Sequence, residues 1–348
     1  MAFKVAGQVG MTLRVGIAGY GLAGRYFHAP LLKGCGFEVV AIQTSNAERT
    51  QHAKSDFPDT TVVATIEELV AKNLDLIVVA SANLVHAHHA LTAISAGIPV
   101  VVDKPMGRTF AETESIVTAA KNAGVGLSTF FNRRWDSDAL TIKKVLGSGV
   151  LGEIHRIDSR FERFRPDLNA ASWRENMSAA DGGGQLLDLQ PHLISTAIDW
   201  FGNAELVTAT VRSLRGGADD DSVLVLRHQS GVMSYLSASA VVGAPGPRIR
   251  ILGTKGALVI NELDPQEALL RAGKFPEGGT WKVPTTSRAF IHRGDEVEEI
   301  ESVPGNYGHF YKEVEAAITT GAGWPIPNED ALLVAQLIDQ AREIGTHV

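Results

Sequence analysis

Residues 12–24 read TLRVGIAGYGLAG, and this stretch predicts how the first part of the chain folds. It begins as a short apolar run, typical of a buried strand, and leads directly into the pattern G-x-G-x-x-G at residues 19–24. Residues 26–32 are again apolar, so the glycines lie between a strand and a helix, as a dinucleotide-binding turn requires. Such glycines allow a tight turn and a close approach of a diphosphate, which the first N–H groups of the helix then face.

Strand-like and helix-like segments alternate from this turn to residue 131. Apolar strand-like runs occur at residues 37–42, 62–63, 74–80, 100–102 and 126–131, with amphipathic segments such as 111–123 between them. The alternation predicts an α/β fold with a doubly wound parallel sheet, a Rossmann domain spanning residues 12–131. We expect residues 1–11 to be a disordered leader.

The pattern changes in the second part, for which we expect one α+β domain at residues 132–348. After a helical segment at residues 136–146, strand-like runs follow without intervening helices, at residues 153–164, 204–212, 222–228, 231–239, 248–252 and 257–260. Such a meander predicts an open antiparallel sheet, with one face on helices and the other free for a partner subunit. Helices at residues 307–319 and 329–344 close the chain, and the last helix could pack back on the first domain.

The composition excludes several classes of function. A chain of 348 residues with 45% hydrophobic content can bury two cores. The net charge of −7 comes from scattered residues without a basic block, which argues against nucleic-acid binding. No apolar run approaches the roughly 18 residues of a membrane helix, and a single cysteine, Cys35, fits a reducing cytoplasm.

The end of the second predicted strand bears on the choice of cofactor. An NAD enzyme would carry an acid there for the ribose hydroxyls, but the sequence reads Gln43-Thr44-Ser45-Asn46, with Arg49 close behind. Hydroxyls and a guanidinium suit a 2′-phosphate. We therefore expect NADP, with NAD as the alternative, although Ser45 and Asn46 could also simply cap a helix.

Another strand-like run that ends in polar residues is VVVDKP, at residues 100–105. Three β-branched residues indicate a buried strand, and Asp103 and Lys104 follow at its carboxyl end. Ligands of open parallel sheets bind beyond the carboxyl ends of the strands, so Lys104 is a candidate functional residue. The alternative interpretation is a solvated turn before Pro105.

Residues 181–192, DGGGQLLDLQPH, supply the second candidate. On a helix, Asp188 and His192 would project from one face. Histidine suits proton transfer near neutral pH, and a neighbouring carboxylate can fix its tautomer. Pro191 must then lie in a first helical turn or bend the helix, and a structural contact between the two side chains is the alternative interpretation.

A metal site is not predicted. His86, His88 and His89 lie close in sequence, but only His86 and His89 would share a helix face, and no third ligand is nearby.

These motifs occur in the order found in the glucose–fructose oxidoreductase / inositol dehydrogenase family, called Gfo/Idh/MocA, which the chain resembles over nearly its whole length. The family's E-K-P motif corresponds to residues 103–105, where Asp103 replaces the glutamate, and its G-G-x-x-x-D-x-x-x-H motif corresponds to residues 183–192. Residues 27–30, 131–136 and 163–166 are similar to the branch of NADP-dependent scyllo-inositol dehydrogenases.

The resemblance implies that Lys104, Asp188 and His192 form the catalytic set. His192 would take the hydroxyl proton as hydride leaves the same carbon, Lys104 would stabilise the alkoxide, and Asp188 would orient the substrate. The expected cofactor contacts are Gly19, Tyr20, Gly21, Leu22, Ala23, Gly24, Thr44, Ser45, Arg49, Ser81, Asn83, His86, Asp103, Lys104 and Asn132. The expected substrate contacts are Lys104, Asn132, Arg133, Arg165, Trp173, Arg174, Asp188 and His192.

We therefore expect a cytoplasmic, NADP-dependent dehydrogenase that acts on a secondary alcohol of a cyclic polyol or sugar, with an inositol-type substrate favoured. A homodimer or homotetramer would form through the open sheet face. Two alternatives stay open, a non-catalytic nucleotide-sensing regulator and a reductase of an anhydro-sugar carbonyl. The presence of all three candidate catalytic residues favours an enzyme.

Overall fold

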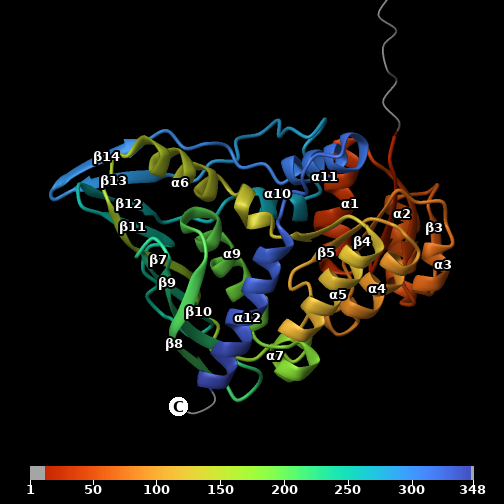
Figure 1. Cartoon of the computed structure of the whole chain (residues 1–348), viewed down its shortest axis with the longest axis horizontal. Helices are drawn as coiled ribbons and strands as arrows, with labels where there is room; N and C mark the ends of the chain where they lie inside the picture. Colours follow the sequence, from red (N-terminus) through yellow and green to blue (C-terminus); the bar gives the residue numbers. More distant parts are fainter. Residues whose placement is uncertain (1–11, 346–348) are drawn as a thin grey trace, which may run out of the picture.

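The structure is a computed structural model that describes residues 12–345, so the leader expected at residues 1–11 lies outside the described part. Two β-sheets form the framework, and helices cover and connect them (Figure 1). The first sheet comes from the N-terminal part of the chain and the second from the C-terminal part.

The first sheet is the predicted Rossmann sheet. Its strands are β1 (Arg14–Ala18), β2 (Glu38–Gln43), β3 (Thr61–Val63), β4 (Leu76–Val79), β5 (Val100–Asp103) and β6 (Leu127–Phe130). All pair in parallel, in the order β3-β2-β1-β4-β5-β6. The order reverses between β1 and β4, and the crevice beyond their carboxyl ends is the ligand position of this architecture.

Helices cover both faces of this sheet. They are η1 (Gly24–His28), α1 (Ala29–Cys35), α2 (Ala47–Asp56), α3 (Ile66–Val70), η2 (Asn83–Val85), α4 (His86–Ser95) and α5 (Phe110–Ala123). The wide π turn of η1 immediately precedes Pro30, a residue that cannot donate a helical hydrogen bond. The π turn also directs His28 into the core, where its side chain is fully buried.

The second sheet has eight strands in the order β14-β13-β12-β11-β7-β10-β9-β8. The strands are β7 (Ile154–Glu162), β8 (Ala204–Arg212), β9 (Asp221–His228), β10 (Met233–Ser239), β11 (Ile249–Gly253), β12 (Gly256–Ile260), β13 (Ala289–Arg293) and β14 (Glu296–Ile300). The predicted meander is confirmed with one difference, because β7 and β10 run parallel. The strands β13 and β14 were not predicted, and β14 is largely charged.

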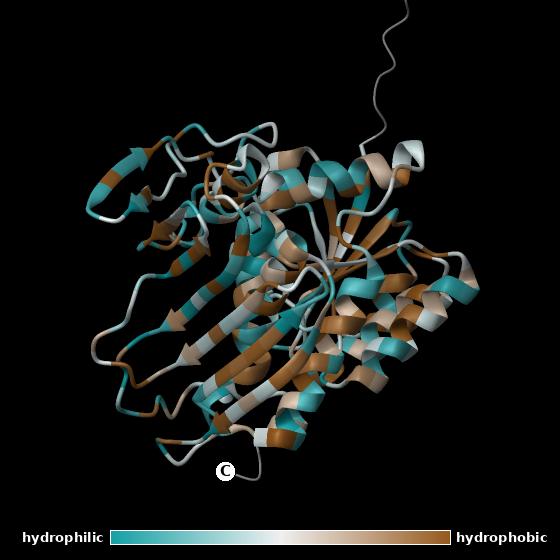
Figure 2. Ribbon diagram, turned by 60° about the vertical axis from the view of Figure 1, so that its left-hand side comes forward, coloured by the Kyte–Doolittle hydropathy of each residue, from teal (hydrophilic) through white to brown (hydrophobic). Residues whose placement is uncertain are grey.

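One face of this second sheet lies on helices and the other is uncovered. Along β10, Ser234, Leu236 and Ala238 are buried, whereas the alternating residues between them are partly exposed. Figure 2 shows the strands with no helix across the viewed face. Hydrophobic alternation of this kind is expected for a sheet with one solvated face.

Helices join the two sheets into one body. They include η3 (Asn132–Trp135), α6 (Ser137–Ser148), α9 (Gln190–Phe201), α11 (Gly308–Thr320) and α12 (Asn328–Gly345). The helix α12 packs against α5 and β6 on one side and against α9 and β8 on the other. A single buried hydrophobic cluster therefore contains residues of both sheets. Within residues 12–345, no helix is both long and apolar enough to span a membrane.

Candidate active site

A cavity of about 920 Å³ lies where the carboxyl edge of the first sheet faces the second sheet. The turn after β1 contributes Leu22 and Ala23, and the end of β5 contributes Lys104. The opposite wall comes from β7 and from the loop before β11, including Phe161 and Gly246. The cavity is therefore built by segments far apart in the sequence.

The glycine-rich turn fits a dinucleotide. Gly19 has a φ of 98°, and a Cβ there would lie 2.5 Å from the Cα of Ser81, so only glycine allows this turn beside β4. A Cβ on Gly24 would lie 2.1 Å from the carbonyl oxygen of Gly19, so the helix packs tightly on the turn. A Cβ on Gly21 would lie 3.6–3.8 Å from the guanidinium atoms of Arg49, its nearest neighbours. Gly21 thus leaves its backbone open to a diphosphate, with a cation alongside.

The end of β2 has no carboxylate. The amide of Gln43 donates to the carbonyl of Ala64 at 2.8 Å. Asn46 caps α2, because its side chain accepts from the backbone N–H of Arg49 at 2.9 Å. Thr44 is buried and Ser45 is exposed. The helix-capping interpretation thus holds for Asn46, and it leaves the side chains of Ser45 and Arg49 available to a ligand.

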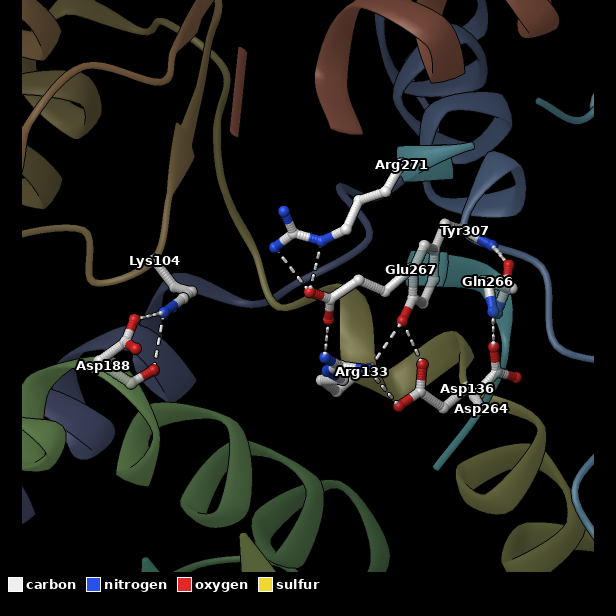
Figure 3. Close-up of polar contacts among 9 residues, drawn as sticks. All are labelled: Lys104, Arg133, Asp136, Asp188, Asp264, Gln266, Glu267, Arg271 and Tyr307. Carbon is white, nitrogen blue, oxygen red and sulfur yellow. Dashed lines mark hydrogen bonds and ion pairs between the residues drawn. The ribbon is translucent and has the colours of Figure 1, made fainter. Parts of the chain in front are cut away.

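Lys104 is held by Asp188. Its ammonium donates to the carboxylate of Asp188 at 2.8 Å and to the backbone carbonyl of the same residue at 2.6 Å (Figure 3). The Nε atom of Arg174 lies 3.2 Å from the same carboxylate. Burial alone would raise the pKa of Asp188, but Lys104 and Arg174 hold that pKa well below its usual range. Asp188 is therefore ionised and fixes the position of the ammonium.

His192 begins a new helix beside this pair. The short helix α8 (Gln185–Asp188) ends at Asp188, and Pro191 lies in the first turn of α9. The structure thus selects the first-turn alternative for Pro191, where its missing N–H costs nothing. Only 8% of His192 is exposed, and its Nδ1 has no hydrogen-bond partner within the described residues.

The imidazole of His192 is held in its neutral form. Burial lowers its pKa well below the ordinary value, and the positive charges of Lys104 and Arg133 lower that pKa further. Its ring lies edge-on to Phe161, with 6.1 Å between the ring centroids. A neutral imidazole in a cavity is suited to accept a proton.

Behind Lys104, the predicted residue Asp103 joins a buried chain of polar groups whose other members, His28 and Tyr311, were not predicted. Asp103 accepts from the backbone N–H of Lys104 at 2.8 Å, and the Nε2 of His28 lies 3.8 Å from the same carboxylate. On its other side, His28 is hydrogen-bonded through Nδ1 to the hydroxyl of Tyr311 at 2.6 Å. Burial would raise the pKa of Asp103, but the net shift is downward because of His28 and Lys104. This chain fixes the backbone at the end of β5.

A second buried network positions Arg133. Its guanidinium donates to Glu267 at 2.6 Å and to the hydroxyl of Tyr307 at 3.1 Å, and it pairs with Asp136 at 3.3 Å. Arg271 holds the other oxygen of Glu267 at 2.8 Å (Figure 3). Glu267 and Arg271 lie on α10 (Gln266–Arg271), a helix that the sequence analysis also missed. Arg133 is thereby fixed at the cavity wall.

The cavity brings together many of the predicted site residues. Those that line it are Leu22, Ala23, Asp103, Lys104, Asn132, Arg133, Arg165, Arg174, Asp188 and His192. Residues that line it but were not predicted include Arg160, Phe161, Arg163, Arg248 and Glu267. The run RFERFR at residues 160–165 is the sequence signal that could have indicated Arg160, Phe161 and Arg163, whereas no local pattern indicates Arg248 or Glu267.

Eleven predicted residues do not line this cavity: Gly19, Tyr20, Gly21, Gly24, Thr44, Ser45, Arg49, Ser81, Asn83, His86 and Trp173. The amide of Asn83 donates to the carbonyl of Gly182 at 3.0 Å. The imidazole of His86 lies between the carbonyl oxygens of Pro105 and Ser81, at 2.8 and 3.0 Å. Trp173 lies against the guanidinium of Arg174, with 4.5 Å from ring centroid to carbon. In this geometry, Asn83 and His86 hold the loops on which the site is built.

The histidines near α4 show no metal-site geometry. His86 is bound to backbone carbonyls, and burial lowers the pKa of His89 to about 4. Among residues 12–345, no three histidine, cysteine, aspartate or glutamate side chains are placed to hold a metal ion.

A cation, a carboxylate and a neutral imidazole thus share one cavity with a turn that fits a dinucleotide. Such an arrangement suits chemistry carried out on a bound nicotinamide cofactor. The class that fold and site define is an oxidoreductase with an NAD-binding Rossmann domain.

Comparison with known proteins identifies the family. The model described as an oxidoreductase family with an NAD-binding Rossmann fold matches residues 13–131, and that of the GFO/IDH/MocA C-terminal domain matches residues 139–259. The chain belongs to the Gfo/Idh/MocA family of oxidoreductases.

Relatives match over nearly the full length. The scyllo-inositol 2-dehydrogenase (NADP(+)) IolW of Bacillus subtilis (strain 168) is 36% identical, covering 95% of this chain and 93% of its own. The uncharacterized oxidoreductase YdgJ of Escherichia coli (strain K12) is 36% identical, covering 97% of both chains. The solved structure of yvaA from Bacillus subtilis has a TM-score of 0.86 at 35% identity, covering 97% of this chain and 96% of that one.

Proposed function

We propose that this protein is an NADP-dependent dehydrogenase that oxidises a secondary alcohol of a cyclic polyol or sugar, in a reversible reaction. The observation that carries the proposal is the meeting of Lys104, at the end of β5, and His192, at the start of α9, in one cavity beside the glycine-rich turn. The relative named scyllo-inositol 2-dehydrogenase supports an inositol-type substrate.

The site residues divide the chemistry between them. When bound, the nicotinamide would accept the hydride of the alcohol carbon. His192, neutral because of its burial, accepts the hydroxyl proton, so that the carbon–oxygen bond becomes a carbonyl. Lys104 places its ammonium next to the oxygen, where negative charge develops. Asp188 holds that ammonium and is ionised throughout.

The NADP preference rests on the surroundings of Gly21. The guanidinium of Arg49 lies beside this turn, and the end of β2 has Gln43 where a carboxylate would repel a 2′-phosphate. Ser45 adds an exposed hydroxyl at the same place. The NADP(+)-dependent relative is consistent with this assignment.

A substrate panel tests the proposal directly. Inositols and aldoses are offered to the purified protein with NADP⁺ and, in parallel, with NAD⁺, and reduced cofactor is followed by its absorbance. We expect turnover of at least one cyclic polyol or pyranose, with higher kcat/KM in the presence of NADP⁺. No turnover of any polyol or sugar in either direction would favour the nucleotide-sensing alternative.

Reduction of an anhydro-sugar carbonyl is the second catalytic candidate. The 1,5-anhydro-D-fructose reductase of Ensifer adhaerens is 26% identical over 71% of this chain. The same three residues would serve that reaction, with His192 as proton donor. Addition of 1,5-anhydro-D-fructose and NADPH to the panel separates the two.

Assembly and location are part of the proposal. The uncovered face of the second sheet offers a broad surface for pairing with another copy of the chain, as a homodimer or homotetramer. Light scattering with chromatography would measure this assembly. The single cysteine, Cys35, is buried and suits a reducing cytoplasm.

A further inference from the structure

Seven arginines line the cavity, together with six carboxylate side chains. The arginines are Arg133, Arg160, Arg163, Arg165, Arg174, Arg248 and Arg271. Four of the seven are paired with carboxylates: Arg133 and Arg271 with Glu267, Arg174 with Asp188, and Arg160 with Glu162. Within residues 12–345, Arg163, Arg165 and Arg248 form no salt bridge with a carboxylate. We refer to these three residues as the unpaired arginines.

The unpaired arginines gather on the second sheet. Arg163 and Arg165 follow the carboxyl end of β7, and both line the cavity together with Phe161 of that strand. Arg248 immediately precedes β11, the strand that pairs with β7. The three guanidinium groups thus come from segments that flank two adjacent strands.

Arg248 is the most constrained of the three. Only 8% of this residue is exposed, and its guanidinium carbon lies 3.9 Å from the centre of the Phe161 ring. One of its nitrogens donates to the hydroxyl of Ser159 at 2.9 Å, whereas its Nε has no hydrogen-bond partner within the described residues. The ring of His192 contacts the same phenylalanine. A buried guanidinium whose Nε has no partner thus lies close to the proton acceptor.

The unpaired arginines favour an anionic ligand in the cavity over a neutral one. Burial lowers the pKa of Arg163, and the adjacent Arg165 lowers it further. Burial also lowers the pKa of Arg248, where Asp138 opposes the shift and Arg133 adds to it. Burying cations without paired anions costs free energy, and such groups concentrate at ligand sites. An anion bound in the cavity would offset that cost.

The cofactor phosphates are a poor explanation for the cluster. The features that fit a diphosphate, Gly21 and the neighbouring Arg49, belong to the first sheet and its helices. The unpaired arginines belong to the second sheet, which forms the opposite wall. The substrate is therefore the ligand that they face.

We propose, on the basis of the dehydrogenase function above, that the substrate is an anionic sugar or polyol. Its carboxylate or phosphate group binds Arg163 and Arg248, with Arg165 at the rim, while the alcohol to be oxidised reaches Lys104 and His192. Guanidinium groups bind both kinds of oxyanion through paired N–H donors. A neutral inositol would leave Arg163 and Arg248 without a directly paired anion in the cavity.

Matched substrate pairs test the inference. Glucose is compared with glucuronate and with glucose 6-phosphate, and myo-inositol with an inositol monophosphate, each with NADP⁺. We expect kcat/KM to be at least about tenfold higher for one anionic class than for its neutral counterpart. The carboxylate and phosphate arms show which oxyanion the site takes. Equal or higher kcat/KM for the neutral member of every pair would overturn the inference.

Variants locate the charge recognition. In Arg163→Gln we expect kcat/KM for the anion to fall on the order of 10- to 100-fold, while that for the neutral substrate changes little. Arg163→Lys keeps the charge and should restore part of the preference. Arg14→Gln is the control, because Arg14 lies in β1 outside the cavity and pairs with Glu38. A loss of NADPH affinity in Arg163→Gln, with substrate preference retained, would contradict the assignment.

Direct binding separates this inference from the proposed function. Calorimetry measures binding of glucuronate and glucose 6-phosphate to wild type and Arg163→Gln without any turnover. Anion binding that requires Arg163, together with no oxidation of any substrate, would support the anion site and contradict the proposed dehydrogenase function. Oxidation of neutral polyols without measurable anion binding would do the reverse.

Discussion

The two ends of the cavity are built on different principles. The end at the first sheet is formed largely by backbone, with Gly19, Gly21 and Gly24 shaping a turn that fits a diphosphate. The end at the second sheet is formed by long charged side chains, among them Arg163 and Arg248. Backbone recognises what all dinucleotides share, whereas side chains can change without disturbing the fold. The difference explains how one framework can keep a cofactor and vary its substrate.

The largest effect is expected where the two ends meet. His192→Ala removes the proton acceptor and Lys104→Ala removes the cation beside the oxygen, so each should lower kcat by about 10²- to 10⁴-fold. The affinity for NADPH, measured by fluorescence titration, should stay within a few fold of wild type. Full activity in either variant would show that the two ends do not cooperate in the proposed way.

The second-largest effect is expected from a substitution in the glycine-rich turn. Gly19→Ala forces a side chain into a left-handed conformation and against Ser81, at a strain of about 1–3 kcal/mol. We expect NADPH binding to weaken by roughly tenfold or more. Gly147→Ala is a matched control, because Gly147 lies in α6 and a Cβ there meets nothing within 4 Å. That control should bind NADPH normally and unfold at a slightly higher temperature.

Cofactor choice should depend on a side chain even at the backbone end. Arg49→Gln removes the cation beside Gly21 and should reduce the preference for NADPH over NADH by about tenfold. The two dissociation constants, measured by calorimetry, give the ratio. Equal affinities for NADH and NADPH in the wild-type protein would contradict the NADP assignment.

The pH dependence of kcat/KM should show whether His192 is neutral in the cavity. An imidazole with the ordinary pKa of about 6.5 would lose about fourfold in kcat/KM between pH 7.5 and pH 6. The pKa of His192 is well below that value, so the loss should be less than about twofold. The same shift makes the folded state bind fewer protons than the unfolded chain, so stability falls as the pH drops below about 6.5. A fourfold acid loss in kcat/KM would indicate a solvated imidazole.

The smallest effect is expected behind Lys104. Tyr311→Phe removes the hydroxyl bound to His28 and should lower the free energy of unfolding by about 1 kcal/mol. Activity should fall less than threefold, since Asp103 keeps its bond from the backbone of Lys104. Thermal denaturation and initial rates measure the two effects. A loss of activity as large as that of Lys104→Ala would mean that Tyr311 acts in proton transfer.

The sequence predicts the backbone end of the cavity better than the end formed by side chains. The glycine-rich turn and the strand before Lys104 are local patterns, and both could be placed from their neighbours in the chain. The bond between His28 and Tyr311 joins residues far apart in sequence, and no periodicity indicates it. Arg163 and Arg248 line the same cavity because β7 and β11, which lie next to them in the chain, pair with each other. The strands β13 and β14 were missed because they are short and β14 is charged on both faces.

The position of α12 has a consequence for motion. Because this last helix lies between the two sheets and contacts both, a hinge motion that separated the halves of the molecule would break the packing on one side of it. Deleting α12 would expose buried surface on both halves of the molecule. We therefore expect the intact protein to unfold in one cooperative transition.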